Sequence, residues 1–390
     1  MEINHLLIKR FSLLSVVQVV NSVFPIALYL LLIDRLSIAT VGVIMSWQMV
    51  FSIVASISNY NFPTILIPVA EKLKSQRILS VYWNRLLQIR FFVVSIVALL
   101  TIFSISFLPE VAILSFMILL GKLFNPSSYF IVMSKNRLLL IYNFCTRLLS
   151  FIIVFLCVTK VTCQWTNFII GCSELFVSIV VLKYIKWSIG FKFIKVSKLF
   201  KFLKKERLPF YIQSVNALII MVIIPLSHLF FGAYTAGVIS IVEKMLMLIR
   251  GISGNLFFSV LPETWHKNNG KTIVLKSIPI FQKITFIIIL ASVAFIFLFK
   301  SIIIQKFSAE MPYYLLLAIV SFIPIILSTP FQILCFKFKR FKTIFYISKV
   351  HLFSLVIGVF ILGKLFGVYG IISSIIIHET LCYYLYRKLN

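Results

Sequence analysis

Long apolar runs, separated by short polar or basic stretches, recur along the whole chain. A run of about 20 apolar residues is long enough for an α-helix to cross the hydrocarbon core of a bilayer. The strict polar–apolar alternation of a membrane β-barrel is absent, so helices are the structure that satisfies the backbone polar groups inside lipid. The pattern predicts an all-α polytopic membrane protein with twelve transmembrane helices, at residues 11–33, 37–58, 91–108, 111–132, 139–158, 165–184, 208–231, 237–260, 278–299, 311–335, 344–363 and 368–386.

Glycine and proline interrupt this pattern at two places. Gly232 separates the seventh apolar run from the eighth, and it predicts a short turn between two helices. Gly121 and Pro126 lie inside the fourth run, where they predict a kink or a partly unwound turn.

The stretch 64–90 has a different character, because it mixes apolar residues with several Lys and Arg. Such a pattern is typical of an amphipathic helix that lies on the membrane surface. We expect Tyr82 and Trp83 to lie at the depth of the lipid headgroups there.

The two halves of the chain resemble each other when the sequence is shifted by 195 residues, half of its 390. The matches need no gap and include polar and small residues as well as the abundant Ile and Val. They pair Gln18 with Gln213, Asn21 with Asn216, Thr40 with Thr235, Gly42 with Gly237, Ser58 with Ser253 and Lys72 with Lys267.

We interpret this similarity as an internal duplication. Each half contains six helices, an even number, so both halves enter the bilayer in the same orientation and form parallel repeats around a central cleft. The sequence predicts an N-terminal six-helix bundle at 1–190, a basic linker at 191–207 and a C-terminal six-helix bundle at 208–390.

Composition and charge agree with a membrane location. The chain is 61% hydrophobic and only 12% charged, which excludes a soluble globular protein. Its net charge of +28 suggests nucleic acid at first, but the basic residues gather on one side of the predicted helices. Such a bias places that side, with both termini, in the cytoplasm, and it adds attraction to anionic membrane lipids. We therefore expect no nucleic-acid partner. The loops on the opposite side hold only Arg35, Lys160, Lys300, Lys306 and Lys364.

Several charged residues lie inside the predicted helices, where each costs roughly 2.5–3.5 kcal/mol on insertion scales. Either they form ion pairs that hold helices together, or the cations line a wet cleft that receives an anion. The cations outnumber the acids, which favours the cleft. We expect an anion site made by Lys122, Arg147, Lys244 and Arg250, and ion coupling at Glu174, Glu243 or Glu379.

Other polar residues in the helices suggest walls for a polar substrate rather than a metal site. Asn21, Asn143, Gln213 and Asn216 are candidates for such a lining. His351 falls near a helix end and is expected at the membrane interface. The six cysteines are scattered without metal-ligand spacing, so we expect no metal and no cofactor.

Four segments together resemble the Wzx-type O-antigen and polysaccharide flippases of the multidrug/oligosaccharidyl-lipid/polysaccharide exporter superfamily. Members of that family share an Arg in the fifth helix, here Arg147, and an acid–Lys pair followed by Arg in the eighth, here Glu243, Lys244 and Arg250. The chain departs from the family pattern at Asn59, where many members have an Asp. The segments are NYNFPTILIPVAEKLKSQR, MSKNRLLLIYNFCTRLLSFIIVF, LPFYIQSVN and YTAGVISIVEKMLMLIRGISGNLFFSVLPETW.

The resemblance implies a transporter without a catalytic site. Its substrate would be an undecaprenyl-diphosphate-linked oligosaccharide, an O-antigen or capsule repeat unit on the way to lipopolysaccharide or capsule. It would cross the bacterial cytoplasmic (inner) membrane by alternating access, with its diphosphate on the predicted cations. A polysaccharide polymerase and a chain-length regulator are the expected protein partners.

Three alternatives stay open at this point. A multidrug or organic-cation exporter of the same superfamily would need acids in excess within the cleft. A lipid II flippase also carries a diphosphate. A membrane-embedded polysaccharide polymerase is more remote, because it should have a large outer loop, and the loops between the predicted helices on that side are short.

Overall fold

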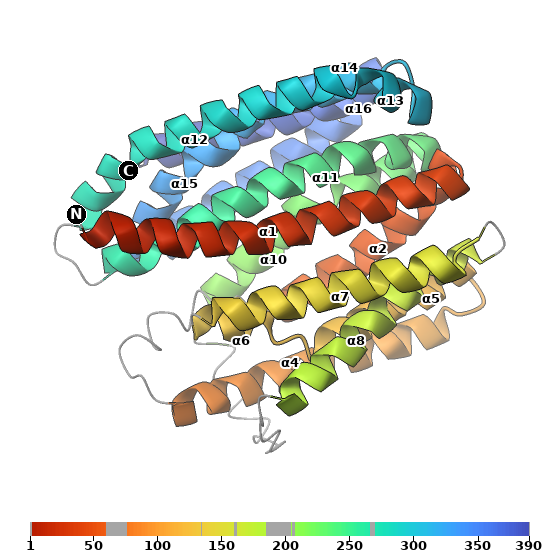
Figure 1. Ribbon diagram of the computed structural model, residues 1–390, viewed down its shortest axis with the longest axis horizontal. Coiled ribbons are helices and arrows are strands. Elements are labelled where there is room, and N and C mark those ends of the chain that lie inside the picture. Colours follow the sequence, from red (N-terminus) through yellow and green to blue (C-terminus); the bar gives the residue numbers. More distant parts are fainter. Residues whose placement is uncertain are drawn as a thin grey trace.

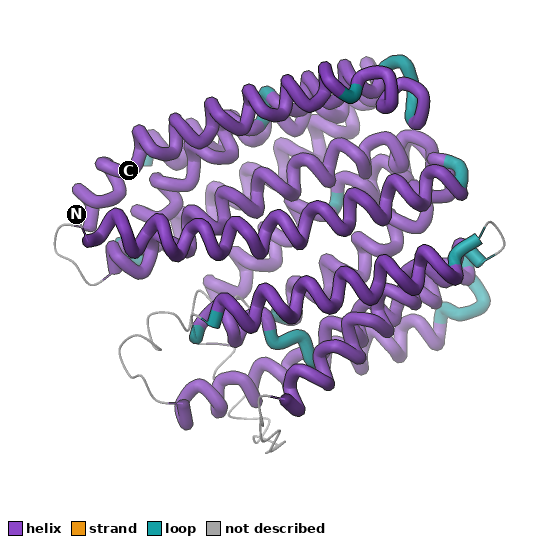
Figure 2. Tube along the Cα trace, in the orientation of Figure 1, coloured by secondary structure: helices purple, strands orange, loops and turns teal. Residues whose placement is uncertain are grey.

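A computed structural model of the chain describes residues 2–59, 76–133, 135–159, 162–184, 204, 207–265 and 270–389. Within these ranges the structure is helical and contains no strand (Figures 1 and 2). Most of the predicted linker at 191–207 lies outside them. The first half contains α1 (Glu2–Arg35), α2 (Ile38–Ser58), α4 (Gln76–Phe103), α5 (Glu110–Leu123), α6 (Ser127–Val132), α7 (Asn136–Cys157) and α8 (Thr166–Tyr184). The second half contains α10 (Arg207–Met221), α11 (Ile223–Trp265), α12 (Gly270–Leu298), α13 (Lys300–Lys306), α14 (Met311–Ile319), α15 (Phe322–Lys337) and α16 (Phe341–Lys388).

Ten helical stretches of the described chain are long and apolar enough to cross a membrane. Two of them, Arg207–Leu261 and Phe341–Lys388, have 55 and 48 residues, more than twice the about 20 that one crossing needs. Each is divided by a glycine in the left-handed region, Gly232 with φ 87° and Gly367 with φ 59°. Each stretch is therefore a pair of membrane helices, which confirms the twelve-helix fold and the turn at Gly232.

The break predicted in the fourth membrane helix is also confirmed. Helix α5 ends at Leu123, and α6 begins at Ser127 after a short non-helical stretch. The Asn125 side chain accepts a hydrogen bond from the Ser127 backbone N–H at 2.8 Å, which satisfies a free donor at the start of α6.

The prediction of a surface helix at 64–90 is wrong for its described part, 76–90. These residues are the first half of α4, and they continue directly into the membrane-crossing part of that helix. Trp83 is fully buried and packs edge-on against Tyr129 of α6 with 6.0 Å between ring centroids. The basic residues suggested a surface position, but the Trp83 face packs against α6 and α7 instead.

Arg90, on the same helix, is buried, and it stabilises the break after α5. Its guanidinium donates to the carbonyl oxygens of Leu123 and Asn125, both at 3.0 Å, and to the Asn59 side chain at 2.6 Å. The last carbonyls of a helix have no partner within it, so a fixed donor fork compensates the polar groups that the break leaves free.

The two halves meet through α1 and α2 on one side and α11 on the other (Figure 1). A Cβ added to Gly42 would lie 2.0 Å from the Ala233 carbonyl oxygen, and one added to Gly237 would lie 2.3 Å from the Ile38 carbonyl oxygen. The two contacts correspond under the shift of 195 residues, because Gly42 matches Gly237 and Ile38 matches Ala233. Such a reciprocal contact is what a two-fold axis between parallel repeats produces.

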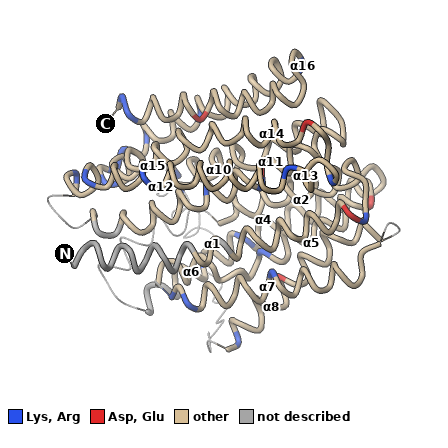
Figure 3. Tube along the Cα trace, turned by 45° about the horizontal axis from the view of Figure 1, so that its top comes forward, with Lys and Arg blue, Asp and Glu red and all other residues tan. Residues whose placement is uncertain are grey.

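Both chain termini lie at the same end of the molecule, which we call the terminal side (Figure 1). The opposite end, the far side, carries the end of α1 and the turn at Gly232. Many of the described Lys and Arg gather at the terminal side, and few lie at the far side (Figure 3).

Polar contacts join the two halves at the far side. The Tyr29 hydroxyl donates to the Gly237 carbonyl oxygen at 2.6 Å, and the Ser240 hydroxyl donates to Tyr29 at 2.5 Å. Lys306 of α13 forms an ion pair with Asp34 at 2.6 Å. These contacts close the bundle at that side.

Candidate functional site

A polar cavity of about 590 Å³ lies between the halves. We call it the large cavity. Its walls come from α1, α2, α5, α6, α7, α8 and α11, together with Arg90 of α4 and Met221 of α10. Most lining residues lie on the terminal-side parts of these helices, for example Val17, Asn59, Asn143 and Asn255.

Three of the four predicted cations, Lys122, Arg147 and Lys244, line the large cavity. The predicted polar residues Asn21 and Asn143 line it as well. Helix α7 presents Asn143 and Arg147, four residues apart and thus on one helical face, while other faces of α7 carry exposed apolar residues.

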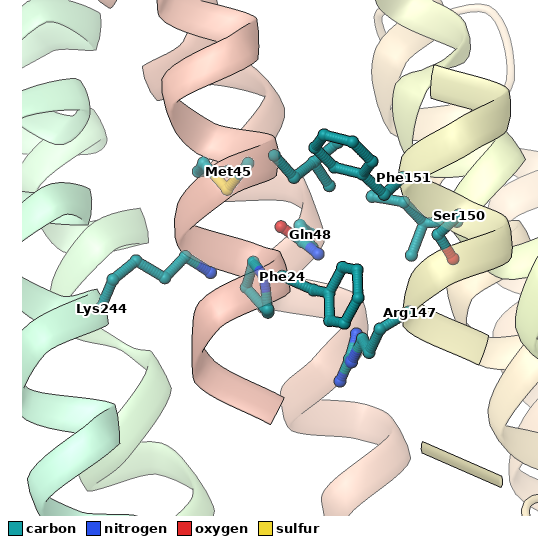
Figure 4. Close-up of a pocket in the computed structure, with 10 residues that line it drawn as sticks. Phe24, Met45, Gln48, Arg147, Ser150, Phe151 and Lys244 are labelled. Atoms are coloured by element: carbon teal, nitrogen blue, oxygen red, sulfur yellow. The ribbon is translucent and has the colours of Figure 1, made fainter. Parts of the chain in front are cut away.

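At the deep end of the large cavity, Arg147 and Lys244 approach the same space. Their side chains extend from α7 and α11 toward Gln48 of α2, which lies between them (Figure 4). Phe24 and Phe151 supply apolar walls beside them. Two chain segments that are about a hundred residues apart thus bring two positive charges to one polar pocket.

The charges in this cavity are not balanced. Glu174 is almost fully buried and accepts from Lys122 at 2.7 Å and from the Asn125 amide at 2.5 Å. In the described part of the chain, Arg147 and Lys244 form no ion pair. Both side chains are half-buried. A cation that is partly removed from water and has no ion pair attracts an anion more strongly than an exposed one, because the surroundings screen its field less.

Arg250 has a different environment from the other three cations. It lines a second space of about 270 Å³, the small cavity, together with the predicted polar residues Gln213 and Asn216. Its guanidinium bonds Glu243 at 2.5 Å and Glu379 at 3.0 Å, so two carboxylates compensate one cation.

The predicted cations therefore do not share one space, and the helical repeat of α11 explains why. Lys244 and Gly251 are seven residues apart on the face toward the large cavity, whereas Glu243 and Arg250 lie on the neighbouring face toward α16. The two cavities still adjoin, because Gly254 and Phe258 line both.

Other residues of the site were missed or misplaced by sequence reasoning. Arg90 lines the large cavity although its basic neighbours suggested a surface. His351, which was expected at the membrane interface, is buried beside Glu379 on the small cavity. The sequence signal for both is weak, because the partners that bury them are distant in the chain.

Solved structures with the same fold are transporters. The chain superposes over its whole length on the eukaryotic MATE transporter AtDTX14, with a TM-score of 0.73, 14% identity and 95% of that chain covered. A mutant of the Vibrio cholerae MATE transporter VcmN gives a TM-score of 0.68 at 13% identity, covering 100% of this chain and 97% of that one.

A third similar structure is a MOP superfamily transporter from Pyrococcus furiosus. It gives a TM-score of 0.65 at 14% identity, covering 98% of this chain and 94% of that one. The fold is thus that of multi-pass membrane transporters. No family model matches the sequence, and no curated protein matches it.

Proposed function

We propose that the chain is a flippase for an undecaprenyl-diphosphate-linked oligosaccharide in the bacterial cytoplasmic membrane. The observation that carries the proposal is the pair Arg147 and Lys244, which reach into the large cavity from opposite walls and form no ion pair among the described residues. A diphosphate supplies the negative charge that this arrangement leaves unbalanced.

In this proposal the diphosphate binds at the deep end of the large cavity. Arg147 offers a planar fork for paired, charge-assisted hydrogen bonds to phosphate oxygens, and Lys244 adds a point charge. Lys122, held by Glu174, lies closer to the terminal side and attracts the headgroup on its way in. The reaction is movement between leaflets, so no covalent step and no catalytic residue is needed.

The remaining parts of the substrate fit the remaining surfaces. Asn21 and Asn143 offer amide groups to sugar hydroxyls, and Asn21 Oδ1 and Gln48 Oε1 are buried acceptors without a protein donor among the described residues. The polyprenyl tail stays in the bilayer, where it needs no polar partner. A polysaccharide polymerase and a chain-length regulator would receive the product on the outer leaflet.

The direction of transport follows from the charge bias and the position of the cavity. Lys and Arg gather at the terminal side, so that side is proposed to be cytoplasmic. The large cavity lies toward it, and polar contacts between the halves close the far side. This arrangement suits loading of a lipid-linked substrate from the inner leaflet.

A multidrug or organic-cation exporter shares the fold and is the second candidate. An organic cation would need a free carboxylate, but Glu174 in the large cavity is already paired with Lys122. The Pyrococcus furiosus transporter is described as having a binding pocket of reverse polarity, which suggests a different function for it. In this chain, more basic than acidic side chains line the large cavity.

The test is complementation of a bacterial strain that lacks its O-antigen flippase. We expect Arg147→Ala and Lys244→Ala to abolish surface glycan at normal protein abundance. Arg147→Lys should retain part of the transport, because Lys keeps the charge but loses the bidentate fork.

Arg137→Ala is the matched control, because it removes an exposed arginine from the same helix outside the cavity. Full surface glycan in both Ala variants would contradict the proposal. Increased resistance to organic cations without glycan complementation would favour the exporter. Rescue of a strain that lacks its lipid II flippase, with no effect on O-antigen, would identify lipid II as the substrate.

A further inference from the structure

Three metal-ligating side chains meet on α16, outside the cationic pocket described above. His351, His378 and Glu379 are all buried, and each offers one ligand atom within 4.8 Å of the others. They come from two membrane helices joined at Gly367, which places residues 27 positions apart side by side. Their imidazole rings have centroids 4.4 Å apart.

The His378 imidazole is held as a metal ligand typically is. His378 Nδ1 lies 2.7 Å from the Ser374 carbonyl oxygen, which accepts its N–H and leaves the Nε2 lone pair free. His378 Nε2 and His351 Nε2 are buried and have no hydrogen-bond partner among the described residues. Metal-binding histidines are typically held in this way, with the other ring nitrogen donating to a carbonyl or carboxylate.

The distances are close to those of a coordination shell. His351 Nε2 lies 3.8 Å from Glu379 Oε2, and His378 Nε2 lies 3.8 Å from Glu379 Oε1, both too far for a hydrogen bond. In a tetrahedral site with bonds of about 2.0–2.1 Å, ligand atoms lie about 3.4 Å apart. The two nitrogens approach different oxygens of one carboxylate, so a rearrangement of the rings and of the carboxylate brings three ligands onto one ion.

We propose that His351, His378 and Glu379 bind a divalent transition-metal ion such as Zn²⁺. Two imidazoles with one carboxylate suit zinc and its neighbours, whereas sodium, magnesium and calcium prefer oxygen ligands. His351 and Glu379 line the small cavity, so the ion has an access route and a fourth position for water. This inference does not depend on the identity of the transported substrate.

The neighbouring charges couple this site to Arg250. Glu379 also accepts from Arg250, which in turn bonds Glu243. A dication on Glu379 competes with the Arg250 guanidinium for the same carboxylate. Metal binding is therefore expected to loosen Arg250 from α16, and removal of the Arg250 charge is expected to tighten metal binding.

The experiment uses the full chain in detergent, stripped with a chelator and freed of any purification tag. Zn²⁺ is titrated against a competing chromophoric chelator, and Co²⁺ is added separately to record visible absorption. We expect one tight equivalent of Zn²⁺ per chain and the intense visible bands of tetrahedral Co²⁺. His351→Asn and His378→Asn should each weaken Zn²⁺ binding by more than about 100-fold, beyond the effect typical of an outer-sphere partner.

Two further variants test whether Zn²⁺ binds at this site: a control histidine elsewhere, and the arginine that competes for Glu379. His228→Asn removes a half-buried histidine from α11 and should leave the affinity unchanged. Arg250→Gln should raise the affinity. The proposal is overturned if the wild type shows no saturable Zn²⁺ binding, or if His351→Asn and His378→Asn bind as His228→Asn does. Stabilisation by Na⁺ alone would also overturn it.

Discussion

Two arginines in this chain show how the same side chain has different consequences inside a membrane protein. Arg147 reaches into the large cavity without an ion pair among the described residues, whereas Arg250 bonds two buried carboxylates. The first is available to an anion from outside the chain. The second already has its anions within the protein, and removing it leaves both of them buried and unpaired.

Arg250→Ala is therefore expected to destabilise the fold, while Arg147→Ala is not. Loss of one partner of a buried ion pair typically costs about 3–5 kcal/mol. We expect a clearly lower unfolding midpoint in detergent for Arg250→Ala and an unchanged or higher midpoint for Arg147→Ala. The triple variant Arg250→Met, Glu243→Gln, Glu379→Gln should recover most of the loss. Equal midpoints for both Ala variants would contradict this distinction.

At the scale of elements, α2 and α11 cross closely at Gly42 and Gly237. The gap at Gly42 leaves no room for a Cβ, because the Ala233 backbone occupies it. Gly254, further along α11, has no atom within 4 Å of its Cβ position. Replacement of glycine by alanine is therefore expected to have opposite effects on stability at Gly42 and at Gly254.

Gly42→Ala is expected to force α2 and α11 apart and to destabilise the protein by about 1–3 kcal/mol, the usual cost of overpacking. Gly254→Ala should be neutral or stabilising, because Ala is the better helix former by about 1 kcal/mol. Thermal unfolding in detergent compares the two. A Gly42→Ala protein as stable as Gly254→Ala would show that the helices separate freely at this crossing.

At the scale of the whole molecule, few polar contacts close the far side between the halves. The Asp34–Lys306 ion pair is half exposed on both partners, and such pairs contribute about 0.2–1 kcal/mol. A difference of that size shifts a two-state equilibrium by no more than about fivefold. The pair can bias which side is open without fixing it.

Lys306→Glu is expected to favour opening at the far side through repulsion from Asp34. In a background without the native cysteines, Ser150→Cys at the deep end of the large cavity reports access. A membrane-impermeant thiol reagent added from the far side should label it up to about fivefold faster in Lys306→Glu. The charge-swapped pair Asp34→Lys with Lys306→Glu should restore the original rate. Unchanged labelling in the single variant would exclude a role for this pair in closure.

The sequence predicts most of the fold because its signals are local. Apolar runs locate the membrane helices, Gly232 marks a turn, and Pro126 marks a break. The surface helix was predicted wrongly because the position of Arg90 depends on carbonyl groups freed by that distant break. A pattern along the chain does not contain this information.

The same limit applies to the candidate site. Sequence reasoning selected Arg147, Lys244 and Arg250, because ionisable residues inside apolar runs are conspicuous. It did not separate them into two cavities, since that depends on how α11 is rotated against α7 and α16. The cluster at His351 and His378 was missed for a related reason, because a turn at Gly367 brings these residues together.

The position of the glycine crossing along α2 restricts how the molecule can move. From Gly42 to the terminal-side end of α2 at Ser58 is about 24 Å, but to its other end at Ile38 only about 6 Å, at 1.5 Å per residue. A rotation of 10° about the crossing would move the first end by about 4 Å and the second by about 1 Å. Turning about this point therefore widens or narrows the terminal-side mouth and barely displaces the opposite one. To release a bulky glycan at the far side, the backbones at Gly42 and Gly237 have to separate, and the point of rotation has to move toward the terminal side.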